Sequence, residues 1–226
     1  MQSKAPRGIA FILDGNRRWA KDKGLPSMMG HKAGFEKLEK CVRWVQARGI
    51  THVTAYIFST ENWHRDEDEV GYLMQLFRDV AHNKAQGFQH EGVALRFVGK
   101  MDLLPEDLRN AIVKIEASNP NQPRITLWIC VSYGARAEIA AAACAAAASG
   151  ESITEESLRK NMWSADMPDP DIIIRTGGEL RLSNFLLWQA AYSELFFIDA
   201  YWPDFSEHML DEVLIEYAER ERRMGR

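Results

Sequence analysis

Two groups of polar residues have the composition of phosphate-binding loops. The first is Asp14-Gly15-Asn16-Arg17-Arg18-Trp19, in which a carboxylate can hold a hard cation and a glycine lets backbone amides approach a ligand. In the second, Arg175, Arg181 and Ser183 flank the turn Gly177-Gly178. The forked donors of arginine suit phosphate oxygens. The sequence therefore predicts two phosphate-binding loops and, with them, two phosphorylated substrates.

A third group, Ser59-Thr60-Glu61-Asn62-Trp63-His64-Arg65, adds an amide at Asn62 and a guanidinium at Arg65. We interpret Trp63 as a packing residue rather than a surface on which a ligand stacks. His31 opens a helical pattern and could donate to a phosphate oxygen, but capping of that helix explains it equally well.

Each group also has a purely structural interpretation. The tripeptide 14–16 fits a turn with an Asx cap, and Arg175 and Arg181 fit surface ion pairs. The acidic run 66–69 fits the complement of a helix dipole, with Glu69 kept as a candidate site residue.

The elements that must position these groups follow from hydrophobic periodicity. Short apolar runs predict buried strands at 9–13, 53–58, 95–98, 125–131 and 172–174. Amphipathic patterns predict helices at 33–48, 69–89, 105–117, 135–148 with 155–161, and 207–223, and a further helix starting near Arg17.

Alternation of strands and helices predicts an α/β fold with parallel strands, right-handed crossovers and helices on both faces of the sheet. In such sheets ligands bind beyond the carboxyl ends of the strands. The three polar groups directly follow the first, second and fifth predicted strands. We therefore expect them to share one site.

Composition bounds the remaining possibilities. A chain of 226 residues suits one domain with one core, which we expect to span residues 1–226. With 28 basic and 32 acidic side chains, the net charge of -4 argues against nucleic acid as a partner. Cys41, Cys130 and Cys144 form no C-x-x-C pair, which argues against a zinc ribbon or a disulfide framework and favours a reducing compartment.

No apolar stretch approaches the roughly 18–20 residues that span a bilayer, and residues 1–7 lack the apolar core of a signal peptide. We expect a cytoplasmic protein. Peripheral contact with a membrane remains compatible with this sequence, since it requires only an exposed apolar surface.

Taken together, the motifs resemble those of the cis-prenyltransferase family, in the family's order and over roughly residues 8–225. They are Asp-Gly-Asn-Arg-Arg-Trp at 14–19, Gly-His-Lys-Ala-Gly at 30–34, Phe-Ser-Thr-Glu-Asn-Trp at 58–63, Tyr-Gly at 133–134, Ile-Arg-Thr-Gly-Gly-Glu at 174–179, Ser-Asn-Phe-Leu-Leu-Trp-Gln at 183–189, Tyr-Ser-Glu-Leu at 192–195, Trp-Pro-Asp-Phe at 202–205 and Arg-Glu-Arg-Arg-Met-Gly at 220–225. A single motif of this kind is weak evidence, but the full set in register is highly specific.

The resemblance implies a homodimer whose subunits each carry a six-stranded, mostly parallel sheet flanked by helices and a hydrophobic tunnel. It implies Mg²⁺-dependent condensation of isopentenyl diphosphate with an allylic prenyl diphosphate, for which we expect farnesyl diphosphate. The expected product is a long-chain Z-polyprenyl diphosphate such as undecaprenyl diphosphate, a precursor of the lipid carrier for cell-wall synthesis.

The resemblance also implies roles for individual residues. Asp14, Asn62 and Arg65 would be catalytic, and Asp14 and Glu194 would hold the metal. The allylic diphosphate would lie against Gly15, Asn16, Arg18 and His31, and isopentenyl diphosphate against Arg175, Arg181 and Ser183. The remaining substrate-binding residues would be Arg17, Trp19, Ser59, Glu61, Trp63 and Glu69, with Arg223 and Gly225 reaching from the tail to the other subunit's site.

Two positions depart from the family pattern. Ser27 stands where an arginine usually precedes Gly-His, which removes one expected contact to the allylic diphosphate. Leu180 stands where some members have a histidine on the metal side. We expect altered affinity and allylic preference rather than loss of activity, because Asp14 and the main arginines are retained.

Other readings of the chain remain. An irregular or short-chain prenyl diphosphate synthase of the same fold would carry bulky residues in its tunnel. A non-catalytic partner subunit would lack the aspartate and arginines that this chain keeps. A trans-type synthase would need D-D-x-x-D helices, and a Rossmann dehydrogenase would need G-x-G-x-x-G after the first strand; the sequence has neither.

Overall fold

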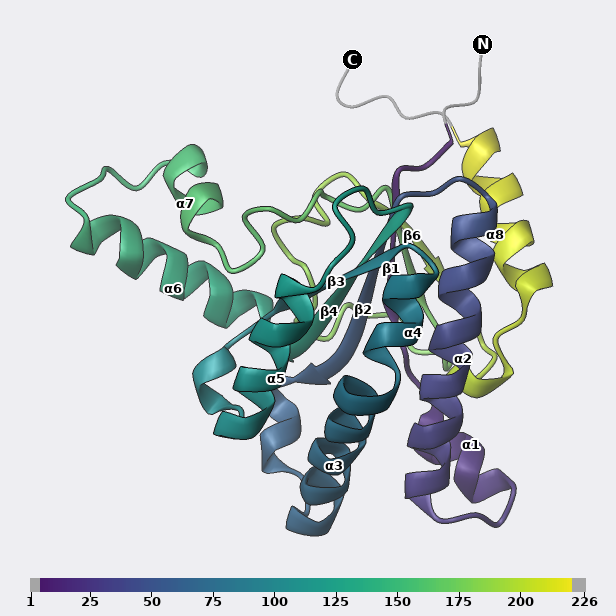
Figure 1. Ribbon diagram of the computed structural model, residues 1–226. Helices are drawn as coiled ribbons and strands as arrows, with labels where there is room; N and C mark the ends of the chain where they lie inside the picture. Colours follow the sequence, from purple (N-terminus) through teal and green to yellow (C-terminus); the bar gives the residue numbers. More distant parts are fainter. Residues whose placement is uncertain (1–4, 221–226) are drawn as a thin grey trace.

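A computed structural model describes residues 5–220, so the expected tail residues Arg223 and Gly225 lie outside the described residues. The strands are β1 (Gly8–Ile12), β2 (His52–Ser59), β3 (Val93–Val98), β4 (Ile125–Tyr133), β5 (Ile172–Arg175) and β6 (Glu194–Phe197). They form a six-stranded sheet in the order β3-β4-β2-β1-β5-β6, with every neighbouring pair parallel (Figure 1). The predicted α/β sheet is confirmed.

Helices connect the strands as the amphipathic patterns predict. They are α1 (Asn16–Asp22), α2 (Ser27–Ala47), α3 (Glu67–Asn83), α4 (Ala85–His90), α5 (Glu106–Ala117), α6 (Ala135–Ala148), α7 (Glu155–Asn161) and α8 (Glu207–Glu219). Short 3-10 helices lie at η1 (Thr60–His64), η2 (Met101–Leu103) and η3 (Trp202–Asp204).

Three elements differ from the prediction. Helix α2 begins at Ser27 rather than near residue 33, because the turn already starts at Pro26, whose carbonyl accepts from the Met29 amide at 2.9 Å. The predicted helix 69–89 is divided at Lys84 into α3 and α4. Strand β6 is not among the predicted strands; it is apolar from Leu195 to Phe197, but only Phe196 of its four residues is buried.

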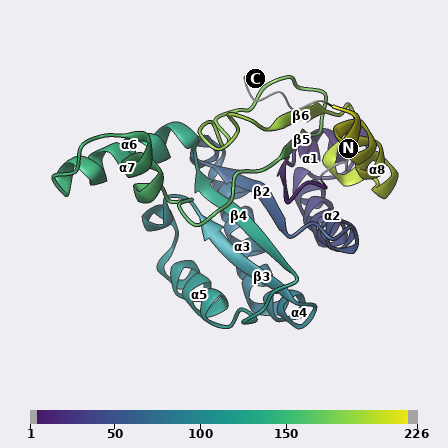
Figure 2. The same cartoon turned by 90° about the horizontal axis from the view of Figure 1, so that it is seen from above.

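The helices gather mainly on one face of the sheet, whereas the sequence predicted helices on both. Side chains of α2, α4, α5 and α8 pack with the strands in the larger core. On the other face, Met167, Phe185 and Leu186 of the segment after α7 and Ala135 of α6 form a second core. Beyond its first turn α6 extends away from the sheet with α7, so it leaves that face to the loop segment (Figure 2).

The sheet order places the ends of β1, β2 and β5 close together. Ile12 of β1 stands opposite both Tyr56 of β2 and Arg175 of β5. Because all three strands run in the same direction, the segments that follow them emerge at the same edge. This edge carries the three polar groups predicted from the sequence.

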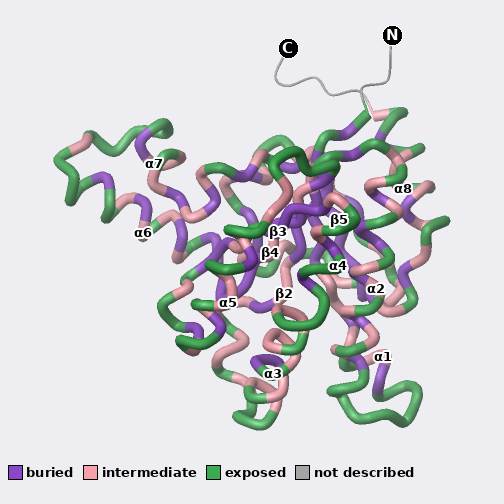
Figure 3. The backbone as a smooth tube through the Cα atoms, in the orientation of Figure 1, coloured by how far each residue is buried: buried purple, intermediate pink, exposed green. Residues whose placement is uncertain are grey.

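The strands are largely buried, whereas residues 21–29, from the last residues of α1 to the first of α2, are all exposed (Figure 3). Within residues 5–220 no helix combines the length and the apolar character required to cross a membrane.

Candidate active site

Asp14 and Arg175 form an ion pair at the carboxyl edge of the sheet. The Arg175 guanidinium donates to Asp14 Oδ2 at 2.8 Å and to Ser183 Oγ at 2.8 Å. Only 3% of Arg175 is exposed, and its Nε has no hydrogen-bond partner among the described residues. Arg18 adds a guanidinium 3.3 Å from Asp14 Oδ1. The two predicted phosphate-binding loops therefore meet in one polar centre.

The loop after β5 depends on left-handed backbone positions. Gly177 and Gly178 have φ values of 88° and 77°. A Cβ on Gly177 would lie 2.7 Å from a guanidinium nitrogen of Arg18, so glycine here permits close approach to α1. Ser183 and Asn184 are also left-handed, with φ of 49° and 63°, which is uncommon for residues other than glycine and marks a constrained segment.

Arg181 is held by the loop itself. Its side chain is more than half exposed and pairs with Glu179, while its carbonyl accepts from Arg175. Glu179 also lies 3.8 Å from Arg18. Arg181 therefore forms an ion pair, as its structural interpretation predicted. The pair with Glu179 leaves the Arg181 guanidinium at the edge of the polar centre.

The loop after β1 is packed tightly against α2. Asn16 Nδ2 donates to the Leu13 carbonyl at 3.0 Å, and Asn16 Oδ1 is buried without a hydrogen-bond partner in the part of the chain that the structure describes. A Cβ on Gly30 would lie 2.1 Å from the Asn16 carbonyl oxygen, and one on Gly34 would lie 2.3 Å from Asn16 Oδ1. The glycines of the Gly-His-Lys-Ala-Gly motif thus have a packing role: they let α2 approach the loop that carries Asp14.

Both tryptophans of the polar groups have hydrogen-bonded, packed indoles. Trp63 Nε1 donates to Ser132 Oγ at 2.9 Å and its ring packs on Phe58 with ring centroids 4.9 Å apart. The interpretation of Trp63 as a packing residue is confirmed. Trp19 Nε1 donates to Asp204 Oδ1 at 2.8 Å, which ties α1 to η3.

Glu69 gathers three basic residues from separate elements. Arg65 donates to Glu69 Oε1 at 2.9 Å, His31 Nε2 lies 3.2 Å from the same oxygen, and Arg17 lies 3.3 Å from Oε2. Burial lowers the pKa of His31 below its ordinary value, and the hydrogen bond with Glu69 offsets this only in part. Glu69 is therefore more than the dipole complement of α3: it joins α3 to α1 and α2 at the site.

The segment after β2 is ordered by its own side chains. Asn62 Oδ1 accepts from the Ser59 amide at 3.1 Å in a capping box. Asn184 Nδ2 donates to Glu61 Oε1 at 2.8 Å. Burial raises the pKa of Glu61, but the hydrogen bond from Asn184 and others within the segment outweigh burial and leave the pKa below its ordinary value. Ser59 and Asn62 thus lie fixed beside the polar centre.

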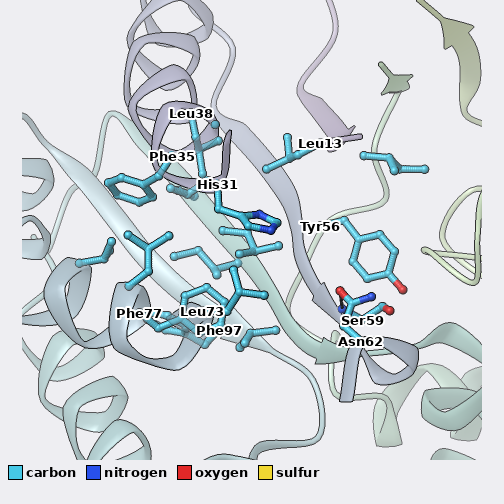
Figure 4. Close-up of a pocket in the computed structure, with 18 of the residues that line it drawn as sticks. Leu13, His31, Phe35, Leu38, Tyr56, Ser59, Asn62, Leu73, Phe77 and Phe97 are labelled. Atoms are coloured by element: carbon cyan, nitrogen blue, oxygen red, sulfur yellow. Dashed lines mark hydrogen bonds between the residues drawn. The ribbon is translucent and has the colours of Figure 1, made fainter. Parts of the chain in front are cut away.

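A cavity of about 760 Å³ opens from this polar centre into the molecule. Asp14, His31, Ser59, Asn62, Arg65 and Arg175 lie among its lining residues at the polar end. Figure 4 shows Phe35, Leu38, Leu73, Phe77 and Phe97 surrounding the apolar part, between α2, α3 and the sheet. A polar mouth with an apolar interior suits a ligand that has an anionic head and a hydrocarbon tail.

Glu194 does not join this centre within one chain. It stands opposite Ile172, which stands opposite Ile9, so its level on the sheet is five residues before Asp14. At ~3.3 Å per residue this is about 17 Å along the strands. Glu194 pairs instead with Arg220 at 2.8 Å. One Mg²⁺ ion cannot contact both carboxylates of the same chain.

Sequence reasoning missed Arg136. This residue in the first turn of α6 lines the same cavity, and Asn184 Oδ1 accepts from its backbone amide at 2.9 Å. The missed signal is its place three residues after the end of β4, because residues that follow the carboxyl ends of the strands are the ones to inspect. The departure residues Ser27 and Leu180 are both exposed, Leu180 at 77%.

Comparisons with known proteins identify the family to which the chain belongs. The family described as "Putative undecaprenyl diphosphate synthase" matches residues 12–225. The chain therefore belongs to this family of cis-prenyltransferases and is a prenyl-transferring enzyme.

Relatives and solved structures match all or nearly all of the chain. The isoprenyl transferase of Fusobacterium nucleatum is 44% identical over 226 residues, covering 100% of this chain and 98% of that protein. That of Thermotoga maritima is 43% identical, covering 98% of this chain and 97% of that protein.

Among solved structures, lavandulyl diphosphate synthase from Lavandula x intermedia, in complex with dimethylallyl diphosphate, has a TM-score of 0.92 and 30% identity, covering 98% of this chain and 99% of that one. A "probable undecaprenyl diphosphate synthase" from Campylobacter jejuni has a TM-score of 0.84 and 28% identity, covering 99% of this chain and all of that one. Both synthases share the fold of this chain.

Proposed function

We propose that this enzyme condenses isopentenyl diphosphate with an allylic diphosphate, with farnesyl diphosphate as the preferred starter, to give a long-chain Z-polyprenyl diphosphate such as undecaprenyl diphosphate. Such a product is a precursor of the lipid carrier used in cell-wall synthesis. The observation that carries the proposal is the meeting of Asp14 and Arg175 at the polar end of an apolar cavity of about 760 Å³.

Each loop takes one diphosphate in this proposal. The allylic diphosphate lies on the loop after β1, where Gly15, Asn16 and Arg18 face the polar centre, with its tail in the cavity. Isopentenyl diphosphate lies on the loop after β5, against Arg175, Arg181 and Ser183. The Arg18 guanidinium and the backbone amides of the loop after β1 stabilise negative charge as it develops on the leaving allylic diphosphate, while Arg175, Arg181 and Ser183 hold the diphosphate of the attacking substrate.

The isopentenyl double bond attacks the allylic carbon as its bond to diphosphate breaks, and loss of one proton gives the new cis double bond. Asn62 is not a base at neutral pH, so its amide orients substrate rather than taking the proton. The leaving diphosphate is the proposed proton acceptor.

The residues present fit a magnesium ion carried by the substrate. Mg²⁺ in such sites is typically held by one or two carboxylates together with substrate phosphates and water. Asp14 supplies one carboxylate at the polar centre, and within residues 5–220 no three His, Cys, Asp or Glu side chains gather into a metal cluster. When bound, Mg²⁺ adds positive charge beside the diphosphate oxygens.

Cavity size admits a product longer than the starter. With about 30 Å³ for each group the size of a water molecule or a methylene, about 760 Å³ accommodates roughly 25 such groups, more than a farnesyl tail contains but fewer than an undecaprenyl tail contains, so the end of the longest product would extend beyond the cavity. A short-chain or irregular synthase is the second candidate, because the lavandulyl diphosphate synthase structure superposes on this chain with a TM-score of 0.92. Phe77 and Phe88, which line the cavity, are the residues that would limit chain length in that case.

Incorporation of labelled isopentenyl diphosphate tests both candidates. The protein is incubated with Mg²⁺ and a dimethylallyl, geranyl or farnesyl starter, and the products are separated by chain length. We expect long products and the highest rate with farnesyl diphosphate. Products that stop after a single condensation would favour the second candidate, and absence of incorporation with every starter would refute the proposal.

Asp14→Ala should nearly abolish turnover while the fold persists, since the change removes the proposed metal ligand from a partly exposed loop. Asp22→Ala is the matched control, because Asp22 is an exposed aspartate at the end of α1, the helix that follows the Asp14 loop. Equal rates for Asp14→Ala and the wild type at saturating Mg²⁺ would contradict the assignment.

We propose that residues 1–226 act as one catalytic domain, that two copies form a homodimer, and that the enzyme works in the cytoplasm with peripheral membrane contact during product release. Light scattering tests the dimer, and flotation with vesicles tests the membrane contact.

A further inference from the structure

Arg136 is the arginine at the cavity whose charge is not matched within the described residues. Three arginines, Arg65, Arg136 and Arg175, are among the lining residues. Arg65 pairs with Glu69 and Arg175 with Asp14. No ion pair or hydrogen bond of the Arg136 guanidinium occurs within residues 5–220, and the residue is exposed. It therefore adds uncompensated positive charge to the mouth of the cavity.

The backbone of Arg136 is fixed even though its side chain is free. Asn184 caps the start of α6: its carbonyl accepts from the Ala135 amide at 2.8 Å and its side chain from the Arg136 amide at 2.9 Å. Ala135 is completely buried. Because this first turn is already rigid, binding has to order only the Arg136 side chain and no backbone segment.

The partners of Asn184 connect Arg136 to one substrate loop in particular. Asn184 follows Ser183, whose hydroxyl accepts from Arg175, and its Nδ2 donates to Glu61. Arg136 is thus anchored to the loop after β5, whereas within residues 5–220 no hydrogen bond joins α6 to the loop after β1.

From this geometry we infer that Arg136 is a further substrate-contacting residue, whose guanidinium binds phosphate oxygens of the diphosphate held by Arg175 and Ser183. The inference rests on the proposed function, in which that diphosphate belongs to isopentenyl diphosphate. The forked donors of arginine fit two phosphate oxygens at once, and a free guanidinium at an anion site needs no ion pair to be broken first.

The test compares Arg136→Gln, which removes the charge but keeps most of the length, with Arg136→Lys, which keeps the charge without the fork. Arg124→Gln is the matched control. Arg124 lies just before β4 whereas Arg136 lies shortly after it, and Arg124 is not among the residues that line the cavity. Unfolding temperatures of all variants establish that each is folded.

We expect Arg136→Gln to raise the KM for isopentenyl diphosphate about tenfold or more, the loss typical of one charge-assisted hydrogen bond, with a smaller increase in Arg136→Lys. The KM for the allylic substrate should change by less than about threefold. Calorimetric titration with inorganic diphosphate and Mg²⁺ should show weaker binding by Arg136→Gln than by Arg124→Gln, independently of turnover.

An unchanged KM for isopentenyl diphosphate in a folded Arg136→Gln protein would overturn the inference, and so would an increase confined to the allylic KM. These outcomes require an active wild type. Failure of the wild type itself to incorporate isopentenyl diphosphate would instead refute the proposed function, so the two failures are distinguishable.

Discussion

Gly30→Ala should destabilise the protein, although alanine favours a helix by about 1 kcal/mol over glycine. Gly30 lies inside α2, and an added Cβ would lie 2.1 Å from the carbonyl oxygen of Asn16 and 2.8 Å from its carbonyl carbon. Because the obstacle is backbone, one of the two segments has to move. Overpacking of this kind costs about 1–3 kcal/mol.

The net effect expected from these opposing terms is a loss of up to about 2 kcal/mol. For a protein of this size this lowers the unfolding temperature by up to about 8 °C. Since Asn16 lies two residues from Asp14, the displacement should also reduce kcat/KM for condensation. Thermal unfolding and the labelled-substrate assay measure the two consequences separately.

Gly71→Ala provides the matched control. Gly71 is an exposed residue of α3, and an added Cβ would meet no atom within 4 Å. The same substitution should therefore stabilise the protein by about 0.5–1 kcal/mol. If Gly30→Ala raised the unfolding temperature as much as Gly71→Ala does, the packing explanation of the Gly-His-Lys-Ala-Gly motif would be refuted.

Three further predictions concern stability, pH and substrate affinity. Glu138 is fully buried and accepts from the Tyr133 hydroxyl, the Ser164 amide and the Gln189 amide. Because Glu138→Ala leaves these donors without that acceptor, it should lower the free energy of unfolding, measured in urea, by about 3 kcal/mol or more. Glu36→Ala, at an exposed position, should change the free energy of unfolding by no more than about 0.5 kcal/mol. A loss equal to that of Glu36→Ala would contradict the role of this network. Burial lowers the pKa of His31 in the folded protein, so as the pH falls from about 6.5 the unfolded chain binds the proton first and stability should decrease. His31→Gln should remove up to about 1.4 kcal/mol per pH unit from this slope below that pH, and identical slopes would show that His31 does not contribute. Ser27→Arg should lower the KM for the allylic diphosphate, by up to about tenfold for one new charge-assisted contact, and an unchanged or higher KM would show that the site does not use this position.

Five strands could be predicted because each is a buried apolar run, and the site could be located because parallel strands bring their carboxyl ends together. Strand β6 was not identified even though Leu195, Phe196 and Phe197 are apolar: it is a short edge strand in which only Phe196 is buried, so its apolar run does not mark a buried strand. The division of the predicted helix 69–89 at Lys84 could not be predicted from the hydrophobic periodicity, because helical hydrogen bonding continues across it. The Lys84 amide donates to the Val80 carbonyl and the Phe88 amide to the Lys84 carbonyl.

Roles of single residues were harder to predict than the place of the site. The motif residues Gly30 and Gly34 have a packing role that only the approach of Asn16 reveals. Glu194 was grouped with Asp14, but sequence order does not indicate that β6 begins at the other end of the sheet from Asp14. The contacts of Glu69 could be predicted only in part, because Arg65 is four residues away whereas Arg17 and His31 come from elements distant in sequence.

The capping of α6 by Asn184 has a consequence for the order in which the enzyme assembles during synthesis. An alanine-rich helix can form early from its own propensity, but its first turn is anchored only after the ribosome has released almost fifty more residues. Contacts of such long sequence separation are typically slow to form. The nascent chain should therefore complete strands β1 to β4 first and acquire a competent catalytic centre last.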